Sequence, residues 1–283
     1  FDPGLVVQAG AVHEATVLSV APTMLHVLVD HLESTGERMP SLRSISYGAS
    51  PITPSILRRA DAVFAADFNQ GYGMTELAGN AVFLDPDDHR RGLGDEPQLL
   101  ASAGRPTEFA EIRILDDDGH DVASGSTGEI AVRGEQVMKG YWRSQETNRE
   151  SFVGDWFRTG DIGRLDADGY LFVIDRKKDV IITGGENVSS REVEDAIATH
   201  PDVGEVAVIG VPDPRWGESV CAVVVPRNGA DLAETDVIAY GRTAIGGFKK
   251  PTRAIFIDEL PRNPSGKVLK RELRELAARQ LGR

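Results

Sequence analysis

The sequence predicts an α/β fold (α+β overall) made of three consecutive regions. Residues 1–70 alternate stretches of helical periodicity with short apolar strands, which is typical of a parallel sheet. Residues 108–174 contain strand-like runs separated by the turn signals DDDG and DADG, which favour antiparallel pairing. From Asp179 onward, short strands and helices follow one another, which predicts a small α+β domain.

The first two regions are predicted element by element. GLVVQAGAVHEA has helical spacing, and TVLSVAP is a short apolar strand ended by Pro22. TMLHVLVDHL and LRSISYG repeat this helix–strand order. In the second region, EIRIL, GEIAVRG and YLFVI alternate or are rich in β-formers, so we expect three strands there.

The third region begins after the charged run DRKKD at 175–179, which is the expected domain boundary. VIIT is a predicted strand, and Ser189 to Glu192 form a capping box that predicts a helix to about His200. GEVAVIGVP and SVCAVVVP are predicted strands, followed by a helix around 234–245, a strand at FIDEL and a charged amphipathic terminal helix.

The composition excludes several classes of protein. The 31 Lys and Arg against 44 Asp and Glu give a net charge of −13, which disfavours nucleic acid and anionic membranes as partners. The one cysteine, Cys221, permits no intrachain disulfide, and its apolar surroundings predict a core residue. No apolar run approaches the roughly 20 residues that span a bilayer. We therefore expect a cytoplasmic protein without a transmembrane segment.

QGYGMTEL at 70–77 is the first segment that indicates chemistry. Glycines let the backbone approach a ligand closely, and the Thr75 hydroxyl could contact phosphate oxygens. Glu76 could bind Mg²⁺, which prefers carboxylate and phosphate ligands. The alternative interpretation is a turn before a helix that Thr75 caps.

Two later segments add candidate polar groups. In WFRTGDIG, Asp161 could accept hydrogen bonds from two ribose hydroxyls, or could stabilise a tight Thr-Gly-Asp turn. In DRKKDVIITGGEN, Arg176 offers a planar set of donors for a ribose or a phosphate. Gly184 and Gly185 leave room for a thin substrate, although a Gly-Gly pair alone indicates only a turn.

Taken in order, these motifs resemble the adenylate-forming superfamily, which contains acyl-CoA synthetases, the adenylation domains of peptide synthetases and beetle-type luciferases. The similar segments run through nearly the whole chain in the order typical of that family. They are YGASP (47–51), GYGMTE (71–76), AGRP (103–106), GEIAVRG (128–134), VMKGYW (137–142), WFRTGD (156–161), DRKKDVIITGGENVSSREVE (175–194), HPDVGEVAVIGVPDPRWGE (200–218) and LPRNPSGKVLKREL (260–273).

The resemblance implies a domain organisation. Residues 1–177 would be the C-terminal half of a large AMP-binding domain, with a parallel α/β sheet and a β-rich, barrel-like region. Residues 178–283 would be a small mobile C-terminal domain, with the hinge at Lys178. In that family a carboxylate attacks the α-phosphate of ATP, and a thiol then displaces AMP while the small domain rotates between the steps.

The resemblance also implies the nucleotide contacts. Thr75 would touch the α-phosphate and Glu76 would bind Mg²⁺, while Asp161 and Arg176 would hold the ribose. The residues expected to border the adenine are Gly48, Ala49, Ser50 and Tyr72.

Two further loops receive roles by resemblance. Gly184, Gly185 and Glu186 would line the path of the pantetheine of coenzyme A. Lys267, in the NPSGK corner after Pro264, would reach the carboxylate and the phosphate during adenylation, where its ammonium offsets developing charge.

One departure from the family pattern limits the expected activity. The glycine-rich and Ser/Thr-rich phosphate loop normally lies upstream of a segment like FDPG, and this chain has none. We therefore expect a C-terminal fragment that is inactive alone, because the pyrophosphate end of ATP would lack its cradle.

The leading function is an ATP-dependent carboxylic acid–CoA ligase that uses Mg²⁺, ATP, coenzyme A and a fatty or aryl acid. The alternatives are a nucleotide-binding fragment without catalysis, a peptide-synthetase-type adenylation domain and, more distantly, a luciferase-like enzyme.

Overall fold

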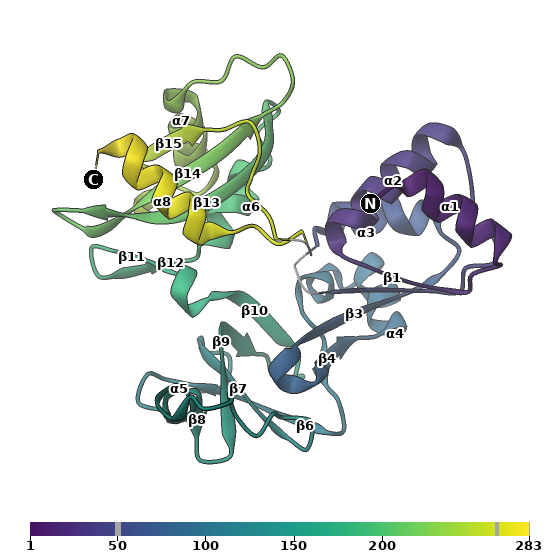
Figure 1. Ribbon diagram of the computed structural model, residues 1–283, viewed down its shortest axis with the longest axis horizontal. Coiled ribbons are helices and arrows are strands. Elements are labelled where there is room, and N and C mark those ends of the chain that lie inside the picture. The colour runs from purple at the N-terminus through teal and green to yellow at the C-terminus, as the bar shows by residue number, and fades with distance from the viewer. Residues whose placement is uncertain (49–51, 264–265, 283) are drawn as a thin grey trace. The chain divides into compact units, whose positions relative to one another are not determined.

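The computed structural model describes residues 1–48, 52–263 and 266–282 (Figure 1). The chain divides into two compact units, Phe1–Val173 and Ile174–Arg283. The predicted contacts Ala49 and Ser50, and Pro264 of the predicted corner, lie outside the described residues. The mixed α/β architecture predicted from the sequence is confirmed, whereas a hinge at Lys178 stays a prediction.

The first unit begins with a five-stranded sheet in the order β1-β2-β3-β4-β5. Its strands are β1 (Val17–Val20), β2 (Ser44–Gly48), β3 (Asp67–Met74), β4 (Gly79–Leu84) and β5 (Arg105–Pro106). The first three strands are parallel, as the alternation of helices and strands predicts. Strands β4 and β5 add antiparallel pairs, which the sequence did not reveal.

The helices of this unit share one sequence signal at their start. They are α1 (Pro3–Val12), α2 (Pro22–Thr35), α3 (Pro54–Val63) and α4 (Pro86–Leu93), with the short 3₁₀ helices η1 (Thr75–Leu77) and η2 (Pro97–Ala101). Each of the four α-helices has proline in its first turn, where the missing N–H costs no hydrogen bond. Pro22 therefore begins a helix as well as ending the preceding strand segment.

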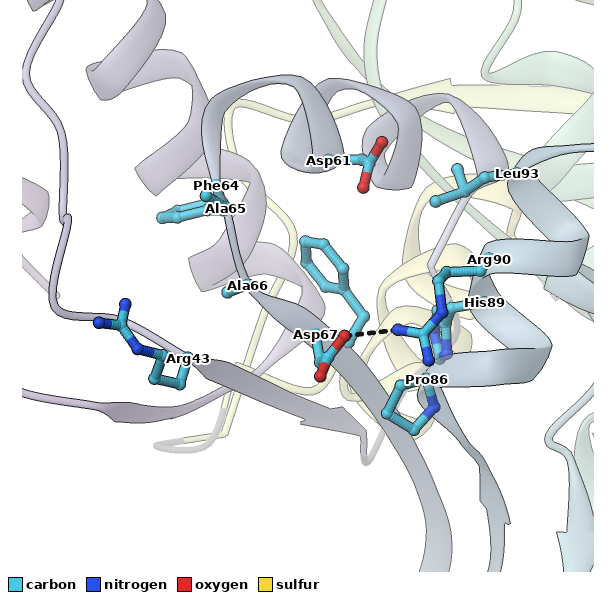
Figure 2. Close-up of a pocket in the computed structure, with 11 residues that line it drawn as sticks. Arg43, Asp61, Phe64, Ala65, Ala66, Asp67, Pro86, His89, Arg90 and Leu93 are labelled. Atoms are coloured by element: carbon cyan, nitrogen blue, oxygen red, sulfur yellow. Dashed lines mark hydrogen bonds and ion pairs between the residues drawn. The ribbon is translucent and has the colours of Figure 1, made fainter.

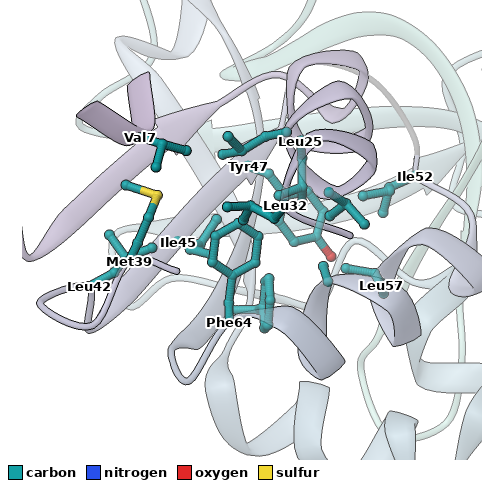
Figure 3. Close-up of a cluster of buried hydrophobic side chains, with 14 of the residues drawn as sticks. Val7, Leu25, Leu32, Met39, Leu42, Ile45, Tyr47, Ile52, Leu57 and Phe64 are labelled. Atoms are coloured by element: carbon teal, nitrogen blue, oxygen red, sulfur yellow. The ribbon is translucent and has the colours of Figure 1, made fainter. Parts of the chain in front are cut away.

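Helices α1 to α3 and the parallel strands enclose a hydrophobic core (Figure 3). Leu25, Leu32, Ile45 and Leu57 are almost completely buried there. Tyr47 from β2 also lies in this core, so its hydroxyl must find a partner inside the protein.

The second sheet of the first unit has the order β10-β9-β7-β6, with β8 paired to β9. The elements are β6 (Ala110–Leu115), β7 (Gly128–Gly134), α5 (Gln145–Ser151), β8 (Phe152–Val153), β9 (Trp156–Leu165) and β10 (Leu171–Arg176), which runs into the second unit. The pairs β6–β7, β7–β9 and β8–β9 are antiparallel, which confirms the prediction from the turn signals.

The second unit contains a sheet in the order β12-β11-β14-β13, with β15 paired to β14. The elements are η3 (Lys177–Asp179), β11 (Ile181–Thr183), β12 (Glu186–Val188), α6 (Ser190–Ile197), β13 (Val203–Asp213), β14 (Gly217–Pro226), α7 (Glu234–Ala244), η4 (Gly247–Lys249), β15 (Arg253–Phe256) and α8 (Lys270–Leu281). Strand β14 is buried on both faces: Val220 and Ala222 pack in one cluster, and Cys221 and Val223 in another. This explains its continuous apolar run.

Three local predictions need correction. The strand predicted at FIDEL lies earlier, because its parallel pairing with β14 uses Arg253–Phe256 and leaves Asp258 and Glu259 beyond the sheet. Helix α6 ends at Ile197, before the predicted His200. Only half of the predicted capping box forms as expected: Ser189 Oγ accepts from the Glu192 N–H at 3.2 Å, whereas the Glu192 carboxylate accepts from Lys249 Nζ.

No helix in the described parts of the chain combines the length and apolar character that crossing a membrane requires.

Candidate functional site

The carboxyl end of β2 approaches the middle of β3 closely through two glycines, at the last residue pair of their parallel ladder. Gly48 is paired with Gly71 in the parallel register. A Cβ atom on Gly48 would lie 2.4 Å from the Gly71 carbonyl oxygen, and one on Gly71 would lie 2.2 Å from Asn80 Nδ2. Gly48 therefore requires glycine because backbone blocks a Cβ atom there, whereas a Cβ atom on Gly71 would require the Asn80 side chain to move. Ligands of open α/β sheets bind at such carboxyl ends of parallel strands.

The structure brings two of the predicted site residues together. Tyr72 follows Gly71 in β3, and its hydroxyl donates a hydrogen bond to Asp161 Oδ2 at 2.7 Å. Asp161 is only 3% exposed although it carries a carboxyl group. A buried carboxylate beside an aromatic ring is suited to accept hydrogen bonds from a bound polar ligand.

Asp161 does not lie in a β-turn, which corrects one interpretation of Thr-Gly-Asp. It belongs to β9, where residues 159–161 bulge opposite Ile130 of β7, because Glu129 pairs with Ile162 and Ala131 with Arg158. Gly160 has a φ of +70°, which suits glycine.

The Thr159 hydroxyl stabilises this bulge from within. It donates to the Ile130 carbonyl at 2.8 Å and accepts from the Asp161 N–H at 3.1 Å. The bulge interrupts the regular ladder and so sets the position of the Asp161 carboxylate.

Thr75 and Glu76 lie in η1, directly after β3. Thr75 is exposed, and Glu76 Oε1 accepts a hydrogen bond from the Tyr141 hydroxyl at 3.0 Å. The Glu76 carbonyl accepts from the Met138 N–H at 2.8 Å, so the segment is fixed at two points. Burial, together with Glu76, raises the pKa of Tyr141, which keeps its hydroxyl protonated as a donor. Sequence reasoning gave Tyr141 no role, although it lies in the GYW segment.

A carboxylate in this position could bind Mg²⁺ together with phosphate oxygens, as expected for Glu76. Another acidic group, made by Asp116, Asp118 and His120, lies on an exposed turn. Asp116 Oδ1 there accepts the His120 N–H at 2.9 Å. Turn geometry explains this second cluster without an ion.

In the second unit, Arg176 ends β10 next to a structural acid that sequence reasoning missed. Asp175 Oδ2 accepts from the Ser190 N–H at 2.6 Å, from Ser190 Oγ at 2.8 Å and from Ser189 Oγ at 3.2 Å. These bonds place a negative charge at the N-terminus of α6, where the helix dipole stabilises it. Lys178 is exposed in η3, and its carbonyl accepts from Arg274 Nη2 at 3.2 Å.

Gly184 and Gly185 form the two-residue turn between β11 and β12. Their φ values of +60° and +86°, with Thr183 paired to Glu186, match the hairpin turn that favours two glycines. A Cβ atom on Gly184 would lie 2.9 Å from Cε3 of Trp216, whose side chain is 47% exposed. The glycines thus give a turn with a bare backbone beside an exposed indole.

Lys267 is exposed after its loop, and Asn263 holds its backbone. The Lys267 N–H donates to Asn263 Oδ1 at 2.9 Å, and the Asn263 N–H donates to the Lys267 carbonyl at 2.9 Å. Arg262 and Val268 form a β-bridge around this loop. The second unit thus carries Arg176, the glycine turn and Lys267, whereas Gly48, Tyr72, Thr75, Glu76 and Asp161 belong to the first.

Comparison with known proteins adds the family. Residues 1–142 match the model of the AMP-binding enzyme family, and residues 192–267 match that of the AMP-binding enzyme C-terminal domain. The chain belongs to the AMP-binding enzyme family. It is therefore a member of the adenylate-forming superfamily, as the ordered motifs in its sequence predicted.

Three relatives illustrate the likeness. A feruloyl-CoA synthase from Amycolatopsis sp is 41% identical over 97% of this chain and 54% of its own length. The medium/long-chain-fatty-acid–CoA ligase FadD8 from Mycobacterium tuberculosis is 39% identical over 97% of this chain and 48% of its own. The structure of the amide bond synthetase McbA from Marinactinospora thermotolerans matches with a TM-score of 0.86 and 39% identity, covering 98% of this chain and 56% of that one. This AMP-binding chain spans about half the length of the curated relatives it matches.

Proposed function

We propose that the chain contributes the nucleotide-binding strands and the catalytic lysine of an ATP-dependent carboxylic acid–CoA ligase. The hydrogen bond between Tyr72 and the buried Asp161 is the observation that carries this proposal. It places a carboxylate and an aromatic ring near the carboxyl ends of parallel strands, which suits a nucleoside with vicinal hydroxyls. The names of the feruloyl-CoA and fatty-acid–CoA relatives support the reaction class.

In this proposal the first unit holds AMP. Gly48 and Tyr72 border the adenine, as do Ala49 and Ser50 by resemblance, and Asp161 accepts the ribose hydroxyls. Thr75 contacts the α-phosphate through its exposed hydroxyl. Glu76 would hold Mg²⁺, which would neutralise phosphate charge when bound. The glycine backbone at β2 and β3 leaves the ligand room to lie against the strand ends.

The second unit supplies the remaining groups. Arg176 offers donors to the ribose, and the Lys267 ammonium lies close to the carboxylate and the α-phosphate during adenylation. A carboxylate oxygen attacks the α-phosphorus, and the bond to pyrophosphate breaks. A thiolate of coenzyme A then attacks the acyl carbon and AMP leaves. The Gly184–Gly185 turn and Glu186 line the path of that thiol, and Lys178 is the hinge between the two steps.

The acid substrate is a fatty or aryl carboxylic acid in this proposal, since relatives of both kinds match equally well. We expect the 283 residues alone to bind AMP without catalysing adenylation. The likeness to an amide bond synthetase gives a specific second candidate, in which an amine takes the place of the thiol. The two candidate functions differ in the group that accepts the acyl chain in the second step, which is the thiol of coenzyme A in one and an amine in the other.

Carboxylate-dependent exchange between ATP and labelled pyrophosphate tests the first step. The gene's full-length product and this chain are compared on a panel of fatty and aryl acids. Exchange by the full-length product alone would support the ligase and identify its acid. Absence of exchange by both, with AMP binding retained, would favour a nucleotide-binding protein without catalysis. Adding coenzyme A or an amine to the active mixture then identifies the acceptor.

Lys267→Ala tests the catalytic role within the full-length product. Loss of the ammonium should slow adenylation by about 10²–10³-fold, which is typical of removing one transition-state contact. Thioester formation from supplied acyl-adenylate should be unchanged. Arg271→Ala is the matched control, because it removes an exposed cation four residues later on α8. Equal loss in both half-reactions would show that Lys267 has a structural role.

A further inference from the structure

A buried polar cluster lies at the residue pair directly before Gly48 and Gly71, the last pair of the parallel ladder between β2 and β3. The Tyr47 hydroxyl is 2.7 Å from His89 Nε2 and 3.2 Å from Gln70 Oε1. Tyr47 is 3% exposed and His89 is 2% exposed, so water does not replace these bonds easily. Tyr47 precedes Gly48 in β2, and Gln70 precedes Gly71 in β3.

The hydrogen-bonding partners fix the direction of each bond. His89 Nδ1 lies 2.7 Å from the Asp85 carbonyl oxygen, which only accepts, so Nδ1 carries the ring proton. Nε2 is then the acceptor, and the single Tyr47 hydroxyl proton points to it. Gln70 Oε1, at 3.2 Å, is a second and more distant acceptor for the same hydroxyl proton.

This cluster joins three elements at one point. Tyr47 and Gln70 are register partners in the parallel pair, directly before the pair of Gly48 and Gly71. His89 comes from α4, whose first turn is fixed by the Asp85 cap. A shift of the Tyr47 side chain would therefore move the strand end that carries Gly48.

Packing alone does not fix His89. Phe68 and His89 line a cavity of about 340 Å³ at the amino ends of β2 and β3, together with Asp67 and Arg90, which form an ion pair (Figure 2). Beside this cavity the imidazole is held by its two hydrogen bonds and by ring contacts with Tyr47 and Phe68, at centroid distances of 5.7 and 6.2 Å.

We propose that His89 is a positioning residue for the nucleotide site, which it orders by holding Tyr47 and, through Tyr47, the end of β2 and the adjoining Gly71 of β3. This inference rests on the proposed function. It predicts that the hydrogen bond contributes to nucleotide affinity and not merely to the stability of the core. His89 would act through Tyr47, one residue before Gly48, without touching the nucleotide.

Tyr170 provides a matched control for the loss of a buried hydroxyl. Its hydroxyl donates to Asp88 Oδ1 at 2.5 Å, and Asp88 is the neighbour of His89 on α4. Tyr170 is as buried as Tyr47, at 2% exposed, but it adjoins neither glycine strand end. Tyr170→Phe should therefore lower stability without changing nucleotide affinity.

Calorimetry with AMP on the gene's full-length product tests the proposal. Tyr47→Phe and His89→Leu should each weaken AMP binding about tenfold, the equivalent of one buried hydrogen bond. The double variant should be no weaker than either single variant, because both remove the same bond. His89→Gln, whose amide oxygen can accept from Tyr47, should restore affinity to within about threefold of the unmodified protein.

Steady-state kinetics give a second measurement. Tyr47→Phe should raise KM for ATP while kcat and KM for the acid stay unchanged. Unchanged AMP affinity, additive losses in the double variant, or an equal loss in Tyr170→Phe would each overturn the positioning role. Failure of the unmodified protein to bind AMP would overturn the proposed function itself, whereas AMP binding that is insensitive to Tyr47 and His89 would overturn this inference alone.

Discussion

Lys270→Met tests whether a half-buried ion pair on α6 stabilises the fold more than an exposed pair on the same helix. Lys270 Nζ lies 2.7 Å from Glu194 Oε1 and donates to Ser190 Oγ at 2.6 Å. The side chains of Lys270 and Glu194 are 16% and 22% exposed. Burial raises the pKa of Glu194, while Lys270 and the Val208 N–H oppose the rise. Removing the lysine leaves the Glu194 carboxylate poorly solvated and without its cationic partner.

The expected loss of unfolding free energy at neutral pH is about 3 kcal/mol, at the lower end of the range for breaking a buried pair. Lys249→Met is the control. Lys249 Nζ lies 2.6 Å from Glu192, also on α6, with side chains 33% and 47% exposed. That pair should contribute no more than about 1 kcal/mol, because solvent screens it and holding two long side chains costs entropy.

The two losses should also differ in pH dependence. Without Lys270 the pKa of Glu194 rises further, so the folded state binds more protons than the unfolded state above the ordinary carboxyl range. Stability of Lys270→Met should therefore recover as pH falls from 7.5 to 5. Urea-dependent hydrogen exchange in α6 and β13 measures this locally. Equal losses for the two variants, or no recovery at pH 5, would refute the assignment of a buried pair.

Three further predictions concern single sites. Gly184→Ala should destabilise the β11–β12 turn by about 1–2 kcal/mol because of the positive φ alone. The new Cβ atom would also lie 2.9 Å from Trp216, and Trp216→Ala should remove only this second part of the loss. A double-mutant cycle in thermal unfolding would separate the two contributions. Burial lowers the pKa of His89 below its ordinary 6.5, so the unfolded state binds more protons than the folded state near that pH. The free energy of unfolding should therefore fall as the pH drops below about 6.5. Calorimetric melts of His89→Gln should show a weaker dependence of stability on pH. Burial raises the pKa of the Cys221 thiol to about 12, so a thiol reagent at pH 8 should react only after urea is added, and fast reaction of the native chain would contradict the buried position.

The sequence predicted the elements whose signal is local. The helical spacing of α1 and α2, the alternating strands and the Gly184–Gly185 turn follow from periodicity or from backbone preference, whereas α3 and α4 were not predicted. The strand at FIDEL was misplaced because its extent depends on which residues of β14 it meets, and no local pattern encodes that register.

The site was predicted less completely, for the same physical reason. Asp161 was named from its motif, but its bulge in β9 depends on the register with β7, which only the fold reveals. Tyr141, which donates to Glu76, lies 65 residues further along the chain, so only the fold reveals the contact. His89 has no motif around it, and its role depends on a contact with Tyr47 across 42 residues.

Ser190 connects Asp175 and Lys270 within the second unit. Its backbone N–H and hydroxyl bind Asp175, which precedes Arg176, and its hydroxyl also accepts from Lys270, three residues after Lys267. A hinge at Lys178 would leave Asp175 before the pivot and Ser190 after it. Rotation about that hinge must then break the bonds between them, whereas the bond from Lys270 to Ser190 lies wholly on the moving side. Asp175 and Ser190 lie in the same compact unit, so a hinge at Lys178 requires these hydrogen bonds to break, whereas a pivot before Asp175 would keep them.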